Sequence, residues 1–298
     1  MQRSNIVSAW TRQVENGQKP DSSDLQDHLT AIHQENAGFT EALASKCRDS
    51  NGKNSYELLA DVIDQDHHSK VLDLACGSGV LLDLCNKRFD SKVSFAGIDI
   101  SNAELKLASE RLIKTDIVLH QSMAQGLDFI ADMSVDVILC HWALTLMDPI
   151  IPVLKTVKRI LKHKGIFAAI VDGDGESAPG YREIHNIIYT HAQRKYSNYG
   201  TIELGDARVR KTDKLLELAG NIFVDFDIKI SPFNLSFSAT PEILARETAG
   251  FFYASFVLSA EEHCLMLREL ENHFFDRMEN GESCFTLPVN LLMIKEAR

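Results

Sequence analysis

The sequence lacks any hydrophobic run long enough to cross a membrane. No stretch of about eighteen apolar residues occurs in it. The residues that follow Met1 lead into no apolar signal core. We therefore expect neither a membrane span nor secretion by a signal peptide.

Long basic runs are also missing. The chain has 31 Lys and Arg against 42 Asp and Glu, a formal net charge of −11. Such a balance repels nucleic acid and anionic lipid unless a basic patch is hidden. The nearest candidate, Lys155–Lys164, is better explained as the solvated face of an amphipathic helix. We expect no nucleic-acid partner and no membrane partner, and the sequence leaves the oligomeric state unknown.

Metal-binding patterns are absent too. None of the six cysteines forms a Cys-x-x-Cys pair, so a zinc site is not expected. Asp172–Glu176 is acidic but lacks the closing Glu of a calcium loop. Several cysteines lie in apolar patterns, where a thiol behaves as a small hydrophobe. We expect no metal, and we expect reduced cysteines in a cytoplasmic protein.

A glycine-rich turn organises what is present. Val71–Val80 reads Val-Leu-Asp-Leu-Ala-Cys-Gly-Ser-Gly-Val, which is how a buried parallel strand delivers the chain to a ligand. Gly77 and Gly79 have no Cβ, so the backbone can bend tightly and approach a ligand closely. A second strand, Lys92–Ile98, ends at Asp99. An acidic residue about twenty positions after the glycines suits a ribose, because a carboxylate can accept from both hydroxyls.

Two classes of cofactor bind to this arrangement of a strand, a glycine-rich turn and an acidic residue after the next strand. A dinucleotide site favours G-x-G-x-x-G, and Leu82 stands where the third glycine would be. S-adenosylmethionine has no phosphate and does not need that glycine. A third interpretation is a glycine turn and a surface Asp that bind no ligand.

At these residues the sequence resembles the class I methyltransferase family. The first family motif reads roughly (V/L)-L-D-(L/V)-G-x-G-x-G, and Val71–Gly79 matches it except that Ala75 replaces the first glycine. Gly97–Ser101 is similar to the second motif. The resemblance extends from about Leu72 to Val171 and implies S-adenosylmethionine as cofactor. It also implies an α/β fold with a doubly wound, mostly parallel seven-stranded sheet and helices on both faces, plus an N-terminal helical segment and helical cap insertions.

The resemblance also implies a set of cofactor-binding residues. They are Asp73, Ala75, Cys76, Gly77 and Gly79 in the first motif, Asp99 and Ile100 in the second, Ser122, Met123 and Ala124 after the third strand, and Cys140 in the fourth. The family usually has Asp at the position of Met123, where it accepts from the adenine amino group. Met123 can only pack on the ring, although the backbone N–H of Ala124 can still meet a ring nitrogen.

Candidates for catalysis and acceptor binding rest on weaker patterns. His141 ends the fourth strand, where the family brings cofactor and substrate together, and it is either a general base or a polar wall residue. Trp142 is either a substrate platform or a core anchor. Tyr181 and His185 recur near helical spacing and either line a substrate pocket or pack an inserted helix. His33 lies in the N-terminal segment, which closes over the cofactor in many relatives.

The expected organisation is a lid followed by one catalytic domain. The predicted segments are an N-terminal helical lid at residues 1–55 and a methyltransferase domain at residues 56–298, with cap insertions at about 173–211 and 238–282. Within this domain we expect Gly165 to cap a helix before a strand at Ile166–Val171. We expect Gly220 to cap another helix before a strand at Asn221–Ile230.

The sequence therefore predicts an S-adenosylmethionine-dependent methyltransferase that acts on a small molecule by in-line displacement. Two alternatives stay open: a methyltransferase for RNA or protein, and a non-catalytic scaffold that binds S-adenosylmethionine. Ala75 and Met123, which both depart from the family pattern, are the reason for the second. A dinucleotide oxidoreductase is a more distant one.

Overall fold

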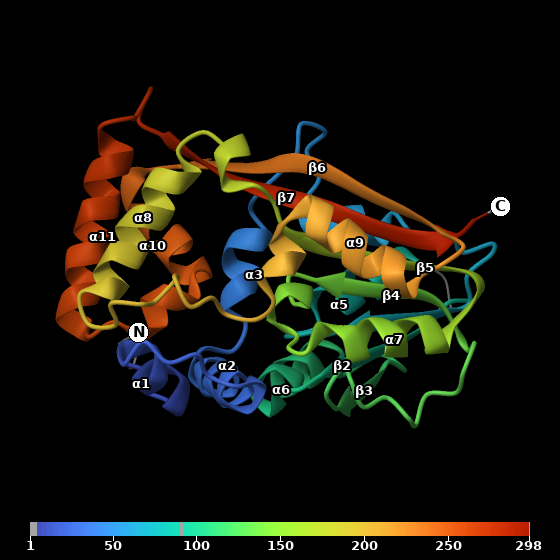
Figure 1. Cartoon of the computed structure of the whole chain (residues 1–298). Coiled ribbons are helices and arrows are strands. Elements are labelled where there is room, and N and C mark those ends of the chain that lie inside the picture. The colour runs from blue at the N-terminus through green and yellow to red at the C-terminus, as the bar shows by residue number, and fades with distance from the viewer. Residues whose placement is uncertain (1–4, 90–91, 298) are drawn as a thin grey trace. The chain divides into compact units, whose positions relative to one another are not determined.

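The computed structural model describes residues 5–89 and 92–297, and they fold into two compact units. The first, here the helical unit, consists of the segment that ends at Gly52, of Asp174–Leu204 and of Asn234–Pro288. The second, here the sheet unit, consists of Lys53–Gly173, Gly205–Phe233 and the segment that begins at Val289. Figure 1 labels their helices and strands along the chain.

The strands form one seven-stranded sheet in the order β3-β2-β1-β4-β5-β7-β6. Their bounds are β1 Lys70–Leu74, β2 Ser94–Asp99, β3 Val118–Gln121, β4 Val135–His141, β5 Leu161–Asp172, β6 Phe226–Ala239 and β7 Ser283–Glu296. Strands β1 to β5 pair in parallel with their neighbours, and β7 runs antiparallel to β5. This confirms the predicted mostly parallel sheet.

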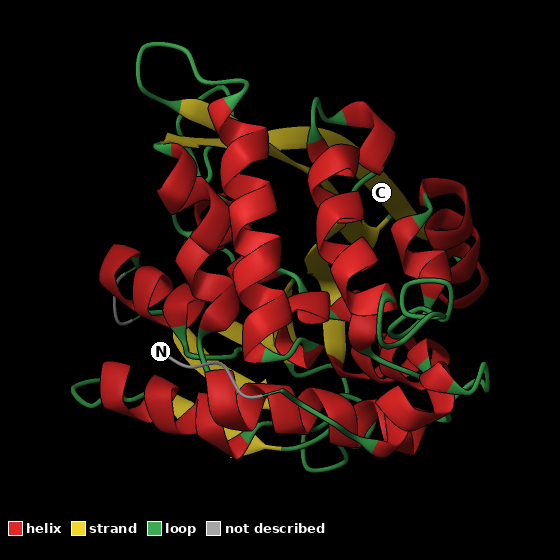
Figure 2. Cartoon of the chain, turned by 90° about the vertical axis from the view of Figure 1, so that its left-hand side faces the viewer, coloured by secondary structure: helices red, strands yellow, loops and turns green. Residues whose placement is uncertain are grey.

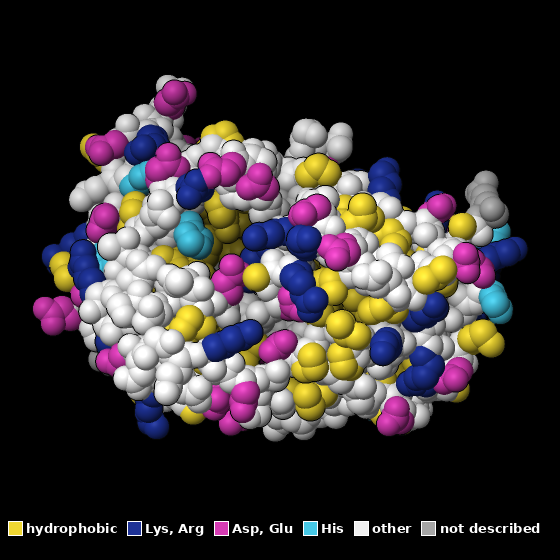
Figure 3. Space-filling view, viewed as in Figure 1, with side chains coloured by type: hydrophobic (Ala, Val, Ile, Leu, Met, Phe, Trp, Pro, Cys, Tyr) yellow, Lys and Arg dark blue, Asp and Glu magenta, His cyan; other side chains and the backbone are white. Residues whose placement is uncertain are grey.

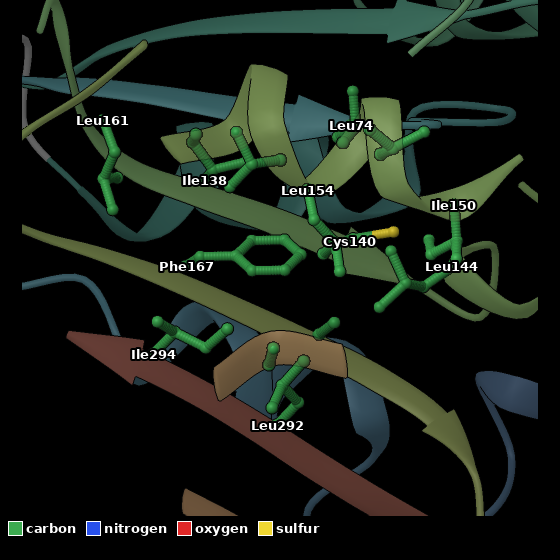
Figure 4. Close-up of a cluster of buried hydrophobic side chains, with 14 of the residues drawn as sticks. Leu74, Ile138, Cys140, Leu144, Ile150, Leu154, Leu161, Phe167, Leu292 and Ile294 are labelled. Carbon is green, nitrogen blue, oxygen red and sulfur yellow. The ribbon is translucent and has the colours of Figure 1, made fainter. Parts of the chain in front are cut away.

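Both faces of the central strands are covered, as an apolar parallel strand requires. The helices beside them are α4 Ser55–Ala60, α5 Val80–Arg88, α6 Asn102–Arg111, α7 Ile150–Ile160 and α9 Thr212–Ile222. Alternate strand residues join α7 and α9 in one buried cluster, while α4 and α5 pack beside the strands on the other face. Figure 4 shows Phe167 of β5 between Ile138 of β4 and Ile294 of β7, the residues it pairs with.

The predicted cap at Gly165 is wrong. Helix α7 ends at Ile160 and the chain enters β5 at Leu161 without a turn. The buried Leu161 pairs with Val135 of β4, so strand pairing begins at once. Gly165 lies inside β5, where a Cβ would come within 2.8 Å of Leu161 Cγ.

The predicted cap at Gly220 is also wrong, and the strand after it begins later than expected. Helix α9 continues through Gly220 to Ile222, and β6 begins at Phe226. A Cβ at Gly220 would meet no atom within 4 Å, so this glycine occupies an open part of the helix surface. Ala219 and Phe223 remain in the core cluster, and this burial extends the helix past the glycine.

The helical unit takes its core from helices in all three of its segments. They are α1 Ala9–Glu15, α2 Ser22–Asn36, α3 Phe39–Ala44, α8 Tyr181–Gln193, α10 Pro241–Phe251 and α11 Ala260–Phe275, drawn in red in Figure 2. Helix α8 packs against α11, and α10 packs against both α3 and α11. The N-terminal helices therefore share one unit with the helices of the later segments.

Candidate functional site

The loop after β1 has an unusual backbone. Ala75, Gly77 and Gly79 all have positive φ angles, of 62°, 50° and 78°. The loop ends at Gly79, which precedes the first residue of α5. The left-handed conformation strains Ala75 by about 1 kcal/mol, because its Cβ crowds the backbone. The turn directs the chain from the carboxyl end of a buried strand straight into a helix, the geometry of a ligand-binding loop.

Asp99 holds this loop from the neighbouring strand. It is the last residue of β2 and is 8% exposed. One carboxylate oxygen accepts from the Gly77 N–H at 2.8 Å, and the other accepts from the Ser101 N–H at 2.8 Å. The predicted ribose-binding carboxylate therefore lies against the glycine loop. Each oxygen has a second lone pair with which it can accept from a ligand hydroxyl.

Helix α6 fixes the other side of the loop. The guanidinium of Arg111, its last residue, donates to the carbonyl oxygen of Ser78 at 2.8 Å and to its Oγ at 3.1 Å. A Cβ placed on Gly79 would lie 3.0 Å from the Cβ of Ala108. Three consecutive loop residues are thus positioned by the β2–α6 segment.

Buried acids surround the loop. Asp73 in β1 is 1% exposed, and its Oδ1 has no hydrogen-bond partner among the described residues. Burial, and then the charge of Asp99, raise the pKa of Asp73 to about 8. Glu104 is also buried, and its Oε2 lies 3.8 Å from where a Cβ on Gly77 would be. Three carboxyl groups in one buried place favour a ligand that brings positive charge.

The residues after β3 lie next to this acidic group. The Ser122 N–H donates to the Asp99 carbonyl at 3.1 Å, which places the turn beside the end of β2. Met123 is 41% exposed, so its side chain is accessible for packing on a flat ring. The half-buried Ile100 and Ala124 complete the short stretches that were predicted to contact the cofactor.

Two of the predicted cofactor residues direct their side chains inward. Cys140 lies in the core cluster of Figure 4, and burial raises its pKa to about 12. Its thiol therefore faces the core, and its backbone is the part that lies at the strand end. Cys76 is buried as well, with its sulfur 2.8 Å from where a Cβ on Gly97 would be. A Cβ at position 97 would therefore require this sulfur and the neighbouring Leu82 and Leu119 side chains to move.

His141 ends β4 in an aromatic setting. Its Nε2 lies 2.8 Å from Ser55 Oγ, and its ring stacks on Tyr56 with centroids 3.9 Å apart. Burial lowers the pKa of His141 to about 3, so the ring is neutral at pH 7. Trp142 meets this ring edge-on at 4.9 Å and has a positive φ of 53°. A neutral imidazole fits both a base and a wall residue, and the assignment as base stays a prediction.

The remaining candidates lie in the helical unit. Tyr181 and His185 share helix α8, with ring centroids 6.2 Å apart, and His185 stacks on Tyr189 at 3.9 Å. His33 belongs to a different group of rings, where its Nε2 lies 3.0 Å from Tyr253 Oη and its ring packs on Phe39. The structure thus brings Tyr181 and His185 together and places His33 among other partners.

Sequence reasoning missed Glu104 and Arg111. Ser101 and Glu104 have the spacing of a capping box, in which the acid would accept from the Ser101 N–H. Here the Ser101 N–H donates to Asp99 instead, so Glu104 is not used as that cap. The spacing of Ser101 and Glu104 could therefore have drawn attention to Glu104 from the sequence alone. No local pattern pointed to Arg111, because its partner lies 33 residues earlier in the chain.

No group of three or more His, Cys, Asp or Glu residues is placed to hold a metal ion in residues 5–89 and 92–297. In the same part of the chain, every helix is too short or too polar to cross a membrane.

The segment that carries the glycine loop and Asp99 is similar to known proteins. Residues 71–165 match the model of a methyltransferase domain. No curated protein matches the chain. The [4+2]-cyclase SpnF aligns with a TM-score of 0.57 and 16% identity over 93% of this chain and 97% of its own.

Two further solved structures are similar. A putative methyltransferase from Bacillus halodurans has a TM-score of 0.54 and 16% identity, over 82% of this chain and 99% of its own. A putative sarcosine dimethylglycine methyltransferase from Galdieria sulphuraria has a TM-score of 0.50 and 18% identity, over 82% of this chain and 85% of its own. At these identities the likeness shows the fold. Together with the matching domain, it confirms the resemblance to class I methyltransferases.

Proposed function

We propose that this chain, which carries a class I methyltransferase domain with S-adenosylmethionine as its cofactor, methylates a small molecule by in-line displacement. The observation that carries the proposal is the match of residues 71–165 to a methyltransferase domain. That range includes the glycine loop, Asp99 and the buried acids around them.

The residues at the loop fit the charge of this cofactor. S-adenosylmethionine has a positive sulfonium and an ammonium group, and Asp73, Asp99 and Glu104 are buried carboxyls beside the loop. The Asp73 Oδ1 is a buried acceptor without a partner among the described residues. When bound, the cofactor supplies a methyl group that the positive sulfur has already activated for transfer.

The chain's own residues would then bind and orient. We assign Asp99 to the ribose hydroxyls of the cofactor and the buried carboxyl groups beside the loop to its sulfonium and ammonium groups. We assign Met123 and the backbone N–H of Ala124 to the adenine. His141 would take a proton from a hydroxyl acceptor, and its low pKa makes it a weak base. A carboxylate acceptor needs no base, so His141 would then be a wall residue.

Three observations support a small acceptor over RNA or protein. The net charge is −11. Lys and Arg side chains lie among Asp and Glu side chains over the face shown in Figure 3. The Galdieria structure is named for small acceptors, sarcosine and dimethylglycine. We also propose a cytoplasmic location, because all six cysteines are free thiols and four of them are buried.

A second candidate is a protein of this fold that does not transfer methyl groups. One observation favours it: the SpnF structure is named as a [4+2]-cyclase. Its fold matches this chain over 93% of the length. Turnover with a methyl acceptor would decide against this candidate.

Calorimetric titration of the full chain tests the cofactor assignment. We expect S-adenosylmethionine and S-adenosylhomocysteine to bind at micromolar concentration, and NADH to give no heat. Binding of NADH alone would show a dinucleotide site instead. Binding of none of the three would contradict the proposed function.

A further inference from the structure

Ser55 and His141 form a hydrogen-bonded pair within the sheet unit. Ser55 is the first residue of α4, and a capping box of Asn54 and Glu57 fixes the start of that helix. Ser55 is fully buried, and its Oγ lies 2.8 Å from the Nε2 of His141 at the carboxyl end of β4. The two residues are 86 positions apart in the chain, so only the fold brings them together.

The Ser55 hydroxyl has a single group to which it can donate. A serine hydroxyl carries one O–H donor and two lone pairs that accept. Among the described residues, His141 Nε2 is the one hydrogen-bond partner of Ser55 Oγ. If Nε2 carried a proton and donated it to Oγ, the Ser55 O–H would be buried without an acceptor, which is unfavourable. The Ser55 O–H therefore donates to Nε2, and Nε2 carries no proton.

The proton of the His141 ring consequently lies on Nδ1. Burial lowers the pKa of His141 to about 3, so the imidazole has one proton at pH 7. In a neutral imidazole one nitrogen donates and the other accepts, and the hydrogen bond made by one nitrogen sets the state of the other. Within residues 5–89 and 92–297, no group accepts a hydrogen bond from Nδ1. Nδ1–H is therefore a donor that the protein leaves open.

This donor lies beside the glycine loop. Strand β4 pairs in parallel with β1, and Leu139 lies opposite Asp73. His141 is two residues beyond Leu139, and Ala75 is two residues beyond Asp73, so the loop begins next to His141. The His141 ring is half-buried and has an aromatic ring stacked on it. A donor that is partly shielded from water forms a stronger hydrogen bond with a ligand than an exposed one.

We infer that Ser55 fixes the proton of His141 on Nδ1, and that His141 binds an oxygen of the methyl acceptor as a hydrogen-bond donor and not as a base. The inference rests on the proposed function, because it assigns roles to two residues in that methyl transfer. His141 would touch the acceptor, whereas Ser55 is a positioning residue that acts only through His141. The acceptor oxygen would then be ionised before it binds, or it would lose its proton to a group other than His141.

Long-range proton–nitrogen correlation spectra of the full chain test the inference, because they distinguish protonated from unprotonated ring nitrogens. The histidines are labelled with nitrogen-15, the protein is saturated with S-adenosylhomocysteine, and His141→Gln assigns the signals of His141. We expect a protonated Nδ1 and an unprotonated Nε2 from about pH 6 to about pH 8. In Ser55→Ala the signals should become averages over the two tautomers, because nothing then fixes the proton. Ser55→Thr, which keeps the hydroxyl, should restore the wild-type pattern.

Ser109→Ala is the matched control. It also removes a serine hydroxyl from a helix of the sheet unit, but one that donates to the Leu105 carbonyl at 2.8 Å. The tautomer of His141 should be unchanged in this variant.

Formate tests the donor directly, since its oxygens accept hydrogen bonds and cannot donate them. With S-adenosylhomocysteine bound, formate should move the proton signal of Nδ1 to lower field in a saturable way. Methylammonium, which has no lone pair, should leave that signal in place. Formate should bind roughly twofold more weakly to Ser55→Ala, because a part of the molecules then lacks the proton on Nδ1.

Three results would overturn the inference. A protonated Nε2 with an unprotonated Nδ1 would make His141 a possible base. Lost affinity for S-adenosylhomocysteine in His141→Gln would show that the donor holds the cofactor and not the acceptor. No response to formate, or an equal response to methylammonium, would show that Nδ1–H binds no acceptor oxygen. Failure of S-adenosylhomocysteine to bind would instead count against the proposed function, and the spectrum of the ligand-free protein would still report the tautomer.

Discussion

The glycine loop of the sheet unit and the aromatic residues of the helical unit both include buried polar groups, but the charges of these groups differ. Around the loop are the carboxyl groups of Asp73, Asp99 and Glu104. Among the aromatic residues of the helical unit are Tyr199, whose pKa burial raises well above its ordinary value, and His28, whose pKa burial lowers to about 4, so both side chains are uncharged at pH 7. Buried acids favour one type of ligand strongly, a cation, because charge is costly to bury alone. Neutral rings bind by shape and by single hydrogen bonds. The comparison indicates that a cationic cofactor suits the glycine loop, where carboxyl groups are buried, and not the neutral groups of the helical unit.

The largest effect should follow removal of the carboxylate that holds the loop. Asp99→Ala removes the acceptor for the Gly77 and Ser101 N–H groups as well as for the ribose. We expect S-adenosylmethionine to bind about 3 kcal/mol more weakly, since hydrogen bonds to charged groups contribute about 1.5–3 kcal/mol each. Calorimetry measures the change, and unchanged affinity would contradict the ribose assignment.

The ionisation of the buried Asp73 carboxyl group can be tested by changing the pH. The pKa of Asp73 is about 8 in the folded chain against an ordinary value of 3.8. The folded state therefore holds this proton more tightly, and the contribution of Asp73 to stability falls as pH rises from about 4 to about 8. We expect Asp73→Asn to raise the melting temperature of the ligand-free protein at pH 8 and to leave it nearly unchanged at pH 4.

Binding of the cofactor should lower the pKa of Asp73 again. A cation beside Asp73 favours the ionised carboxylate, so binding of S-adenosylmethionine should release a proton between pH 6 and 8. Calorimetry in two buffers with different ionisation enthalpies measures that release. Asp73→Asn should abolish it.

Arg111 should have a smaller effect on the same site. Arg111→Met removes two hydrogen bonds to Ser78 but retains much of the side-chain volume. Because Arg111 is half-buried, we expect a loss of about 1 kcal/mol in affinity for S-adenosylmethionine. Arg277→Met is the matched control, since Arg277 donates to a backbone carbonyl in the helical unit. Equal affinity in the two variants would show that Arg111 does not position the loop.

His141 should have the smallest effect on cofactor binding. His141→Ala should leave the affinity for S-adenosylmethionine nearly unchanged and lower turnover with a hydroxyl acceptor. Because its pKa is about 3, the wild-type pH–rate profile should show no histidine inflection near pH 6.5. An inflection there that disappears in the alanine variant would show that His141 titrates normally during the reaction.

Much of the fold followed from patterns that are local. The strand and glycine turn at Val71–Gly79, and the second strand with Asp99, were predictable because a buried parallel strand and its turn leave a contiguous signature. Helix ends were predicted less well. Gly165 and Gly220 looked like caps, but tertiary burial of Leu161 and Phe223 decided where α7 and α9 end.

The sequence by itself determined the parallel sheet, the loop and the candidate cofactor residues, because each depends on residues within about one strand and one turn. Only the tertiary structure revealed that Asp99 and Arg111 form hydrogen bonds with the loop from neighbouring elements, and that Asp73 is a buried acid. Hydrogen bonds between distant residues, desolvation and the absence of a partner depend on what the fold brings nearby, and no local pattern of residues encodes them.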